Sequence, residues 1–104
     1  MIKPMRFAFD VDGVITEMPE LFSALTVALK AAGHYVYILT DFDEHFREQR
    51  LKELAKYNIA FDEMIITSQK EQFVRDHAID YAFDDDREYY GNSLPLQFYA
   101  FAKP

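Results

Sequence analysis

Aspartates recur in two short clusters of this 104-residue chain, and these clusters hold the residues best suited to chemistry. Asp10 and Asp12 stand two apart directly after an apolar run, and three consecutive aspartates, 84–86, follow another. Carboxylates packed together repel one another and raise each other's pKa, and a hard divalent cation with oxygen ligands relieves that repulsion. The pattern therefore predicts a Mg²⁺ site if the fold brings the two clusters together.

The elements that must position these acids alternate between strands and helices. Short apolar runs predict strands, and the amphipathic segments between them predict helices, the third starting at a capping box of Ser68 and Glu71. We predict strands over residues 5–9, 35–39, 63–66, 79–83 and 96–101, and helices over residues 19–32, 43–57 and from 68 onward. The buried helix faces are predicted to carry Leu21, Leu25, Ala28, Leu29 and Ala32, then Leu51, Leu54 and Ala55, and finally Phe73, Val74 and His77.

This alternation indicates a single α/β domain over residues 1–104, Rossmann-like, with a mostly parallel five-stranded sheet. In such sheets, ligands bind beyond the carboxyl ends of the strands. Three predicted strands end in polar residues: the first at Asp10, the second at Thr40 and Asp41, and the fourth at Asp84. We expect these side chains to meet at one edge of the sheet.

Two basic residues fit the same edge. Lys70 precedes Phe73 and Val74 by three and four residues, and Arg47 precedes Leu51 by four, so each extends a buried stripe toward the strand ends. Both are placed to reach a phosphoryl group there. The alternative for each is a solvated residue on the helix surface.

Four segments, in order, resemble the motifs of the haloacid dehalogenase (HAD) superfamily. Phe9-Asp10-Val11-Asp12-Gly13-Val14 resembles the first motif, Ile38-Leu39-Thr40 the second, Lys70 the third, and Phe83-Asp84-Asp85 the fourth. The resemblance covers nearly the whole chain. It implies an HAD-like three-layer sandwich, and the four residues 15–18 between the first motif and the first helix leave no room for a cap domain there.

The resemblance also implies a mechanism. Asp10 would attack phosphorus to form an aspartyl-phosphate, and Asp12 would protonate the leaving oxygen and then deprotonate the hydrolytic water. Mg²⁺ would be held by the Asp10 carboxylate, the Asp12 backbone carbonyl and an acid of the fourth motif. Thr40 and Lys70 would donate hydrogen bonds to the transferring phosphoryl group. Such chemistry depends on positioning and charge neutralisation, which these residue types supply.

The predicted site is therefore a set of three overlapping groups. They are the catalytic residues Asp10, Asp12, Thr40 and Lys70, the metal ligands Asp10, Asp12, Asp84 and Asp85, and the substrate-binding residues Gly13, Thr40, Asp41, Arg47 and Lys70. Two alternatives stay open. The fourth motif fits Asp85 and Asp86 as well as Asp84 and Asp85, and Asp41, with Glu44 three residues later, also fits a helix N-cap.

These features predict a Mg²⁺-dependent phosphatase acting on a phosphate monoester. Without a cap, the site suits a large phosphorylated macromolecule, a small phosphorylated substrate, or a second subunit that serves as a lid. The alternative is a non-catalytic module that binds a metal or ligand, either HAD-like or like a response-regulator receiver. Receivers carry adjacent acids after the first strand and the phosphorylated aspartate after a later one, so the order seen here favours the phosphatase.

Charge and composition exclude several other classes. The formal net charge is −7 and no basic run occurs, which disfavours a nuclease and stable binding to nucleic-acid backbones or anionic membranes. There is no cysteine, so disulfides and thiolate metal sites are impossible. The N-terminal residues lack the apolar stretch of a signal peptide, and we expect a cytoplasmic protein.

Overall fold

The computed structural model describes residues 3–86 and 97–100, and within them helices and strands alternate as predicted. The elements are β1 (Arg6–Phe9), the wide helical turn η1 (Val11–Ile15), α1 (Pro19–Ala31), β2 (Tyr35–Thr40), the 3₁₀ turn η2 (Glu44–Phe46), α2 (Arg47–Lys56), β3 (Glu63–Ile66), α3 (Lys70–Asp76), β4 (Tyr81–Asp84) and β5 (Gln97–Ala100). The predicted third strand agrees at both ends. Residues 96 and 101 of the predicted last strand lie outside the described residues.

All strand pairs in the sheet are parallel, which confirms the predicted α/β class. Within residues 3–86 the strand order is β3-β2-β1-β4, and β5, described for its backbone, pairs with β4 beyond them. This is the order of a Rossmann-like sheet, in which the chain runs from β1 toward one edge and later returns to build the other. The neighbouring strands β1 and β4 are in register with Phe9 beside Phe83.

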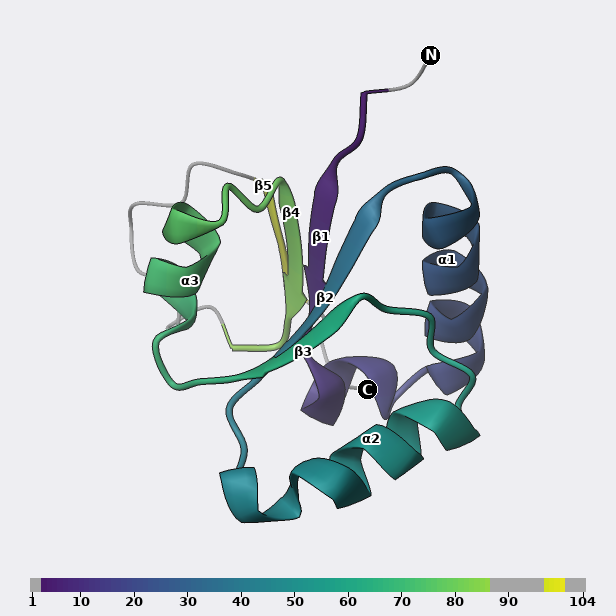
Figure 1. The fold of residues 1–104 in the computed structure, drawn as a ribbon, viewed down its shortest axis with the longest axis vertical. Helices are drawn as coiled ribbons and strands as arrows, with labels where there is room; N and C mark the ends of the chain where they lie inside the picture. Colours follow the sequence, from purple (N-terminus) through teal and green to yellow (C-terminus); the bar gives the residue numbers. More distant parts are fainter. Residues whose placement is uncertain (1–2, 87–96, 101–104) are drawn as a thin grey trace.

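Helices cover both faces of the sheet (Figure 1): α1 and α2 lie on one side and α3 on the other. Alternate residues of β2 point to opposite faces, as the pleat of a strand requires. Val36 and Ile38 belong to the core under α1 and α2, whereas Tyr37 and Leu39 belong to the core under α3. The sheet is therefore buried on both sides, and the predicted apolar strands follow from that burial.

Helix α1 is rotated relative to the predicted buried face. Phe22 and Thr26 are buried, whereas Leu21 is 47% exposed, and Ala28 and Ala32 are exposed as well. The prediction was wrong at these three positions because α1 is apolar on more than one side, and the packing of the Phe22 ring edge-on against Phe9 sets its rotation. Leu25 and Leu29 pack against the core as expected.

The end of α1 agrees with the prediction that Gly33 terminates it. Gly33 has φ +91°, a conformation that glycine adopts without strain. Its N–H donates to the Lys30 carbonyl, and the His34 N–H donates to the Leu29 carbonyl, both at 3.0 Å. These paired hydrogen bonds satisfy the last carbonyls of the helix and direct the chain into β2.

Helix α2 differs from its prediction at the cap and on the inner face. Asp43, not Asp41, caps the helical segment, because its Oδ1 accepts a hydrogen bond from the His45 N–H at 2.9 Å. The buried residues are Arg50 and Leu54. Leu51 and Ala55, predicted inside, are exposed.

Helix α3 starts later than the capping box predicted, since its N-cap is Gln69 and makes no side-chain cap hydrogen bond. Thr67, not Ser68, accepts a local hydrogen bond there, from the Gln69 N–H. Lys70 and Val74 are buried and Phe73 packs against the same core. No helix within residues 3–86 is both long and apolar enough to cross a membrane.

Candidate functional site

Two of the predicted acids meet at the carboxyl ends of the neighbouring strands β1 and β4. Asp10 follows β1 directly and Asp84 is the last residue of β4. The Asp10 N–H donates to the Phe83 carbonyl at 2.9 Å, which fixes the end of one strand against the other. The chain departs from β1 and β4 toward opposite edges of the sheet, and ligands bind at such a switch in strand order.

Lys70 links the two acids. Its side chain is 1% exposed, and its Nζ lies 2.7 Å from Asp84 Oδ2 and 3.4 Å from Asp10 Oδ1. Lys70 reaches this point because it opens α3, with Val74 one turn later anchoring the same face in the core. A buried charge without partners is costly, so the three charged groups stabilise one another. The prediction that Lys70 extends the buried stripe of its helix is confirmed.

The carboxyl group of Asp10 is strongly perturbed. Burial raises its pKa from 3.8 to about 7; the positive charge of Lys70 opposes this rise and the negative charge of Asp84 adds to it. Asp10 Oδ1 also accepts a hydrogen bond from the Val11 N–H at 2.8 Å, which favours the charged form. One lysine therefore does not fully compensate the two buried carboxylates.

Asp10, Asp84 and Asp85 offer carboxylate oxygens that all lie within 4.8 Å of one another. Such a donor set, oxygen only and negatively charged, fits a hard divalent cation such as Mg²⁺. Asp86 is exposed, and its backbone N–H donates to Asp84 Oδ1 at 2.9 Å. The cluster therefore combines Asp10 with Asp84 and Asp85, one of the two registers that the sequence left open.

Thr40 ends β2 at the same edge. Its side chain is 1% exposed, and among the described residues its Oγ1 has no hydrogen-bond partner. Buried hydroxyls are normally satisfied, because leaving one unpaired costs free energy. Thr40 therefore offers an unpaired hydroxyl at the edge of the sheet where Asp10 also lies, and its role toward a phosphoryl group stays a prediction.

Gly13 and Asp12 form a tight turn after β1. Asp12 (φ −69°, ψ 126°) and Gly13 (φ 80°, ψ −2°) have the angles of a type II turn, which requires a positive φ at its third residue. The Gly13 N–H donates to Thr16 Oγ1 at 3.0 Å. This turn explains why a glycine follows Asp12, and it leaves the Asp12 side chain 65% exposed.

Asp12 is paired with a residue that sequence reasoning missed. Arg50, in α2, donates from Nη2 to Asp12 Oδ2 at 2.6 Å and from Nη1 to Asp12 Oδ1 at 3.2 Å. The Arg50 side chain is 3% exposed, its guanidinium lies 3.8 Å from the centroid of the Phe42 ring, and Nη1 also donates to Glu53. Burial lowers the pKa of Arg50, but the hydrogen bonds to Asp12 and Glu53 outweigh it and raise the pKa above its ordinary value.

The only sequence signal for Arg50 was its spacing, four residues before Leu54 on the same face of α2. Arg47, which we predicted at the site, lies one turn earlier and ion-pairs with Glu44 at 2.5 Å, while its Nη1 donates to the Met64 carbonyl at 3.3 Å. Asp41 follows β2 and is exposed. Asp41 does not belong to the group of carboxylates around Asp10, and the described contacts of Arg47 are with Glu44 and Met64.

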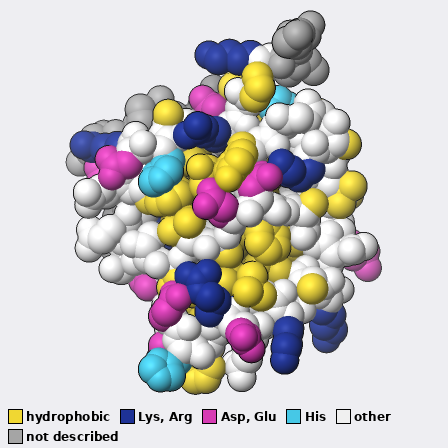
Figure 2. All heavy atoms as spheres, in the orientation of Figure 1, with side chains coloured by type: hydrophobic (Ala, Val, Ile, Leu, Met, Phe, Trp, Pro, Cys, Tyr) yellow, Lys and Arg dark blue, Asp and Glu magenta, His cyan; other side chains and the backbone are white. Residues whose placement is uncertain are grey.

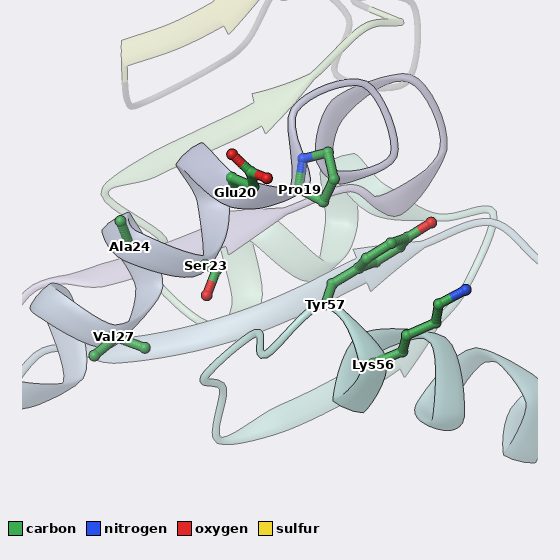
Figure 3. A pocket seen from close by; sticks show the side chains of 7 residues that line it. All are labelled: Pro19, Glu20, Ser23, Ala24, Val27, Lys56 and Tyr57. Atoms are coloured by element: carbon green, nitrogen blue, oxygen red, sulfur yellow. The ribbon is translucent and has the colours of Figure 1, made fainter.

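A separate groove of about 650 Å³ lies between α1 and the end of α2 (Figure 3). Its lining residues are Pro19, Glu20, Ser23, Ala24, Val27, Lys56 and Tyr57. None of them is a residue of the acidic cluster. The groove and the acidic cluster therefore lie at different places on the molecule. The stronger candidate for a functional site is the cluster, because it combines buried charges with the raised pKa of Asp10.

No known family model, no curated protein and no solved structure matches this chain. The interpretation of the site therefore rests on its own geometry and on the motif resemblance.

Proposed function

We propose that this protein is a Mg²⁺-dependent phosphohydrolase of the HAD type, which cleaves phosphate monoesters through an aspartyl-phosphate on Asp10. The observation that carries the proposal is the buried Asp10–Lys70–Asp84 arrangement, with Asp85 beside it, at the switch point of the sheet. A nucleophilic carboxylate, a fixed cation and further metal-binding acids are the parts that phosphoryl transfer needs.

In the proposed first step, an Asp10 oxygen forms a bond to phosphorus as the bond from phosphorus to the ester oxygen breaks. The leaving oxygen takes its electron pair and receives a proton from Asp12. In the second step, water attacks phosphorus, Asp12 accepts the water proton, and the bond from Asp10 to phosphorus breaks. Lys70 and the Thr40 hydroxyl donate to phosphoryl oxygens. Asp10, Asp84 and Asp85 would hold Mg²⁺, which would offset the negative charge of the phosphoryl group.

The short connections around the site bear on the substrate. Nine residues, 10–18, join β1 to α1, and three residues, 41–43, join β2 to η2, so neither connection contains an inserted domain. A site that neither of these connections covers accepts the phosphate of a small molecule or of a macromolecule alike. We propose phosphate monoesters as the substrate class on this basis.

A non-catalytic binding module is the second candidate, and one observation favours it. Both carboxylate oxygens of Asp12 accept hydrogen bonds from Arg50, so this ion pair forms without any substrate present. A domain that binds a metal or a phosphorylated ligand without turnover would tolerate that pairing. Turnover separates the two candidates.

The decisive experiment is hydrolysis of 4-nitrophenyl phosphate with Mg²⁺ or with EDTA. The proposal requires metal-dependent release of 4-nitrophenolate that Asp10→Asn abolishes. Asp76→Asn, at the exposed end of α3, is the matched control and should retain wild-type activity. If wild type and Asp10→Asn are equally inactive on this ester and on a panel of nucleotides and sugar phosphates, the binding module is the better assignment.

A further inference from the structure

Arg50 is held more firmly than the carboxylate it contacts. Its guanidinium is buried against the Phe42 ring and also binds Glu53, one turn later in α2, at 2.7 Å. Cation–π contact and a second carboxylate fix the plane and direction of the group. Arg50 is thus a rigid donor at the inner face of α2.

Asp12 has a fixed backbone but a solvent-exposed side chain. The type II turn and the hydrogen bond from the Gly13 N–H to Thr16 set its backbone. Its side chain is 65% exposed, and in the part of the chain that the structure describes, Arg50 is the partner found for its carboxylate. Without that partner, an exposed aspartate samples several rotamers.

We infer that Arg50 is a positioning residue, which holds the Asp12 carboxylate in one orientation beside the phosphoryl site. The inference rests on the proposed function, in which Asp12 transfers the protons of the reaction. Because Arg50 binds both oxygens in a fork geometry, it sets the direction of the carboxylate as well as its place. The contact connects α2 to the turn after β1, so a helix remote in sequence controls the proton-transfer group.

With 4-nitrophenyl phosphate as the substrate, the two reaction steps depend on Asp12 to different degrees. 4-Nitrophenolate leaves without protonation, so formation of the aspartyl-phosphate needs little help from Asp12. Hydrolysis of the aspartyl-phosphate requires a water proton to reach Asp12 as the new phosphorus–oxygen bond forms. Misplacing Asp12 therefore slows the second step more than the first.

The test is pre-steady-state hydrolysis of 4-nitrophenyl phosphate by Arg50→Lys with saturating Mg²⁺. Lysine keeps the positive charge but lacks the planar guanidinium that binds both oxygens of Asp12. We expect steady-state kcat to fall about tenfold, the size of loss typical when a residue that orients a functional group is removed. We also expect a burst of 4-nitrophenolate close to one equivalent per enzyme, which the wild type lacks or shows at lower amplitude.

Arg75→Lys is the matched control, because Arg75 pairs with Glu71 on the exposed side of α3. It should keep the kinetics of the wild type. A purely structural role of Arg50 would reduce the active fraction and so diminish burst and steady state together, which would overturn the inference. Unchanged or higher kcat without a burst would overturn it too.

A second readout does not depend on turnover. In the wild type, the Nη protons of Arg50 should give separate NMR signals, since a bidentate carboxylate slows rotation of the guanidinium. Asp12→Asn should merge them, and signals equally resolved in both proteins would contradict the pairing. If the wild type does not hydrolyse the ester, both the proposed function and the inference are wrong. If the wild type hydrolyses it but Arg50→Lys shows no burst, only the inference is wrong.

Discussion

At the scale of single residues, Lys70 determines whether the acidic edge is stable without metal. It is buried between Asp10, whose side chain is 9% exposed, and Asp84, which is fully buried. Removing one member of a buried charged group leaves the others uncompensated. The lysine thus has a structural role that needs no ligand, as well as the proposed role toward phosphate.

We expect Lys70→Met to lower the free energy of unfolding by about 3 kcal/mol at pH 8 in EDTA, because it leaves two buried carboxylates without a cation. Urea unfolding measures the loss. At pH 5 the loss should be smaller, since Asp10 is then protonated in the folded state. Lys52→Met, on the exposed side of α2, should change stability little. An equal loss at both pH values would show that packing, not charge, is responsible.

The perturbed pKa of Asp10 gives a second prediction. Its carboxyl has a pKa of about 7 when folded and an ordinary value of 3.8. Between these values the folded state holds a proton that the unfolded state has lost, so the contribution of Asp10 to stability falls as pH rises from about 4 to about 7. A pKa that differs by one between the folded and unfolded states corresponds to about 1.4 kcal/mol of stability.

Asp10→Asn should remove this fall, because an amide does not titrate. In EDTA we expect the variant to be more stable than wild type at pH 8 by about 1 kcal/mol or more, and the difference to shrink below pH 5. Thermal or urea unfolding across pH 4–8 checks it. A difference between the proteins that does not vary with pH would refute the assignment of the raised pKa to Asp10.

At the scale of elements, the strands were predictable because burial on both faces gives them short continuous apolar runs. β3 agrees at both ends, and β2 extends one residue to Thr40. Asp10, Asp84 and Lys70 were found for the same reason: a parallel sheet brings strand ends and the first turns of helices to one edge. Element order alone was enough to place them together.

Helix rotation and the role of Arg50 were not predictable in the same way. α1 has apolar residues around most of its circumference, so periodicity does not choose between Leu21 and Phe22. In α2, an arginine fills a core position that a pattern of apolar residues assigns to Leu51. The Arg50 guanidinium is buried against Phe42 and its Nη atoms donate to Asp12 and Glu53, although its Nε has no hydrogen-bond partner among the described residues. Hydrophobic periodicity does not record these tertiary contacts.

The turn after β1 gives a prediction at this scale. Gly13 and Gly33 both have a positive φ, of 80° and 91°, where an alanine is strained. A Cβ on Gly33 would meet nothing within 4 Å, so its cost is conformational alone. We expect each glycine-to-alanine variant to lose about 1 kcal/mol of stability or somewhat more in urea unfolding.

Activity separates the two glycines. Gly13→Ala should also reduce turnover of 4-nitrophenyl phosphate, because the turn carries Asp12 between Asp10 and Gly13. Gly33→Ala, at the opposite end of β2 from Thr40, should not reduce it beyond the effect of lower stability. Equal activities for the two variants at a temperature where both are folded would argue against a role of the turn in the site.

At the scale of the whole molecule, the net negative charge opposes the binding of an anionic substrate. The net charge is −7, and acidic and basic side chains are interspersed on the face drawn in Figure 2. An anionic phosphate is repelled by such a protein unless its charge is compensated locally. Lys70 is already engaged by two acids, so a divalent cation at Asp10, Asp84 and Asp85 is the compensation that the site favours.

Metal binding should therefore stabilise the fold. A ligand present at about tenfold above its Kd contributes about 1.4 kcal/mol, which raises the Tm of a domain of this size by about 6 °C. We expect this rise with MgCl₂ and not with NaCl at equal ionic strength, because screening alone does not bridge three carboxylates. Differential scanning fluorimetry measures this rise in Tm.

Asp85→Asn should abolish most of the rise and Asp76→Asn should retain it, since Asp85 belongs to the cluster and Asp76 lies exposed at the end of α3. A rise of the same size with NaCl, or in Asp85→Asn, would mean that Mg²⁺ acts on the surface charge as a whole and that the acidic edge is not a metal site.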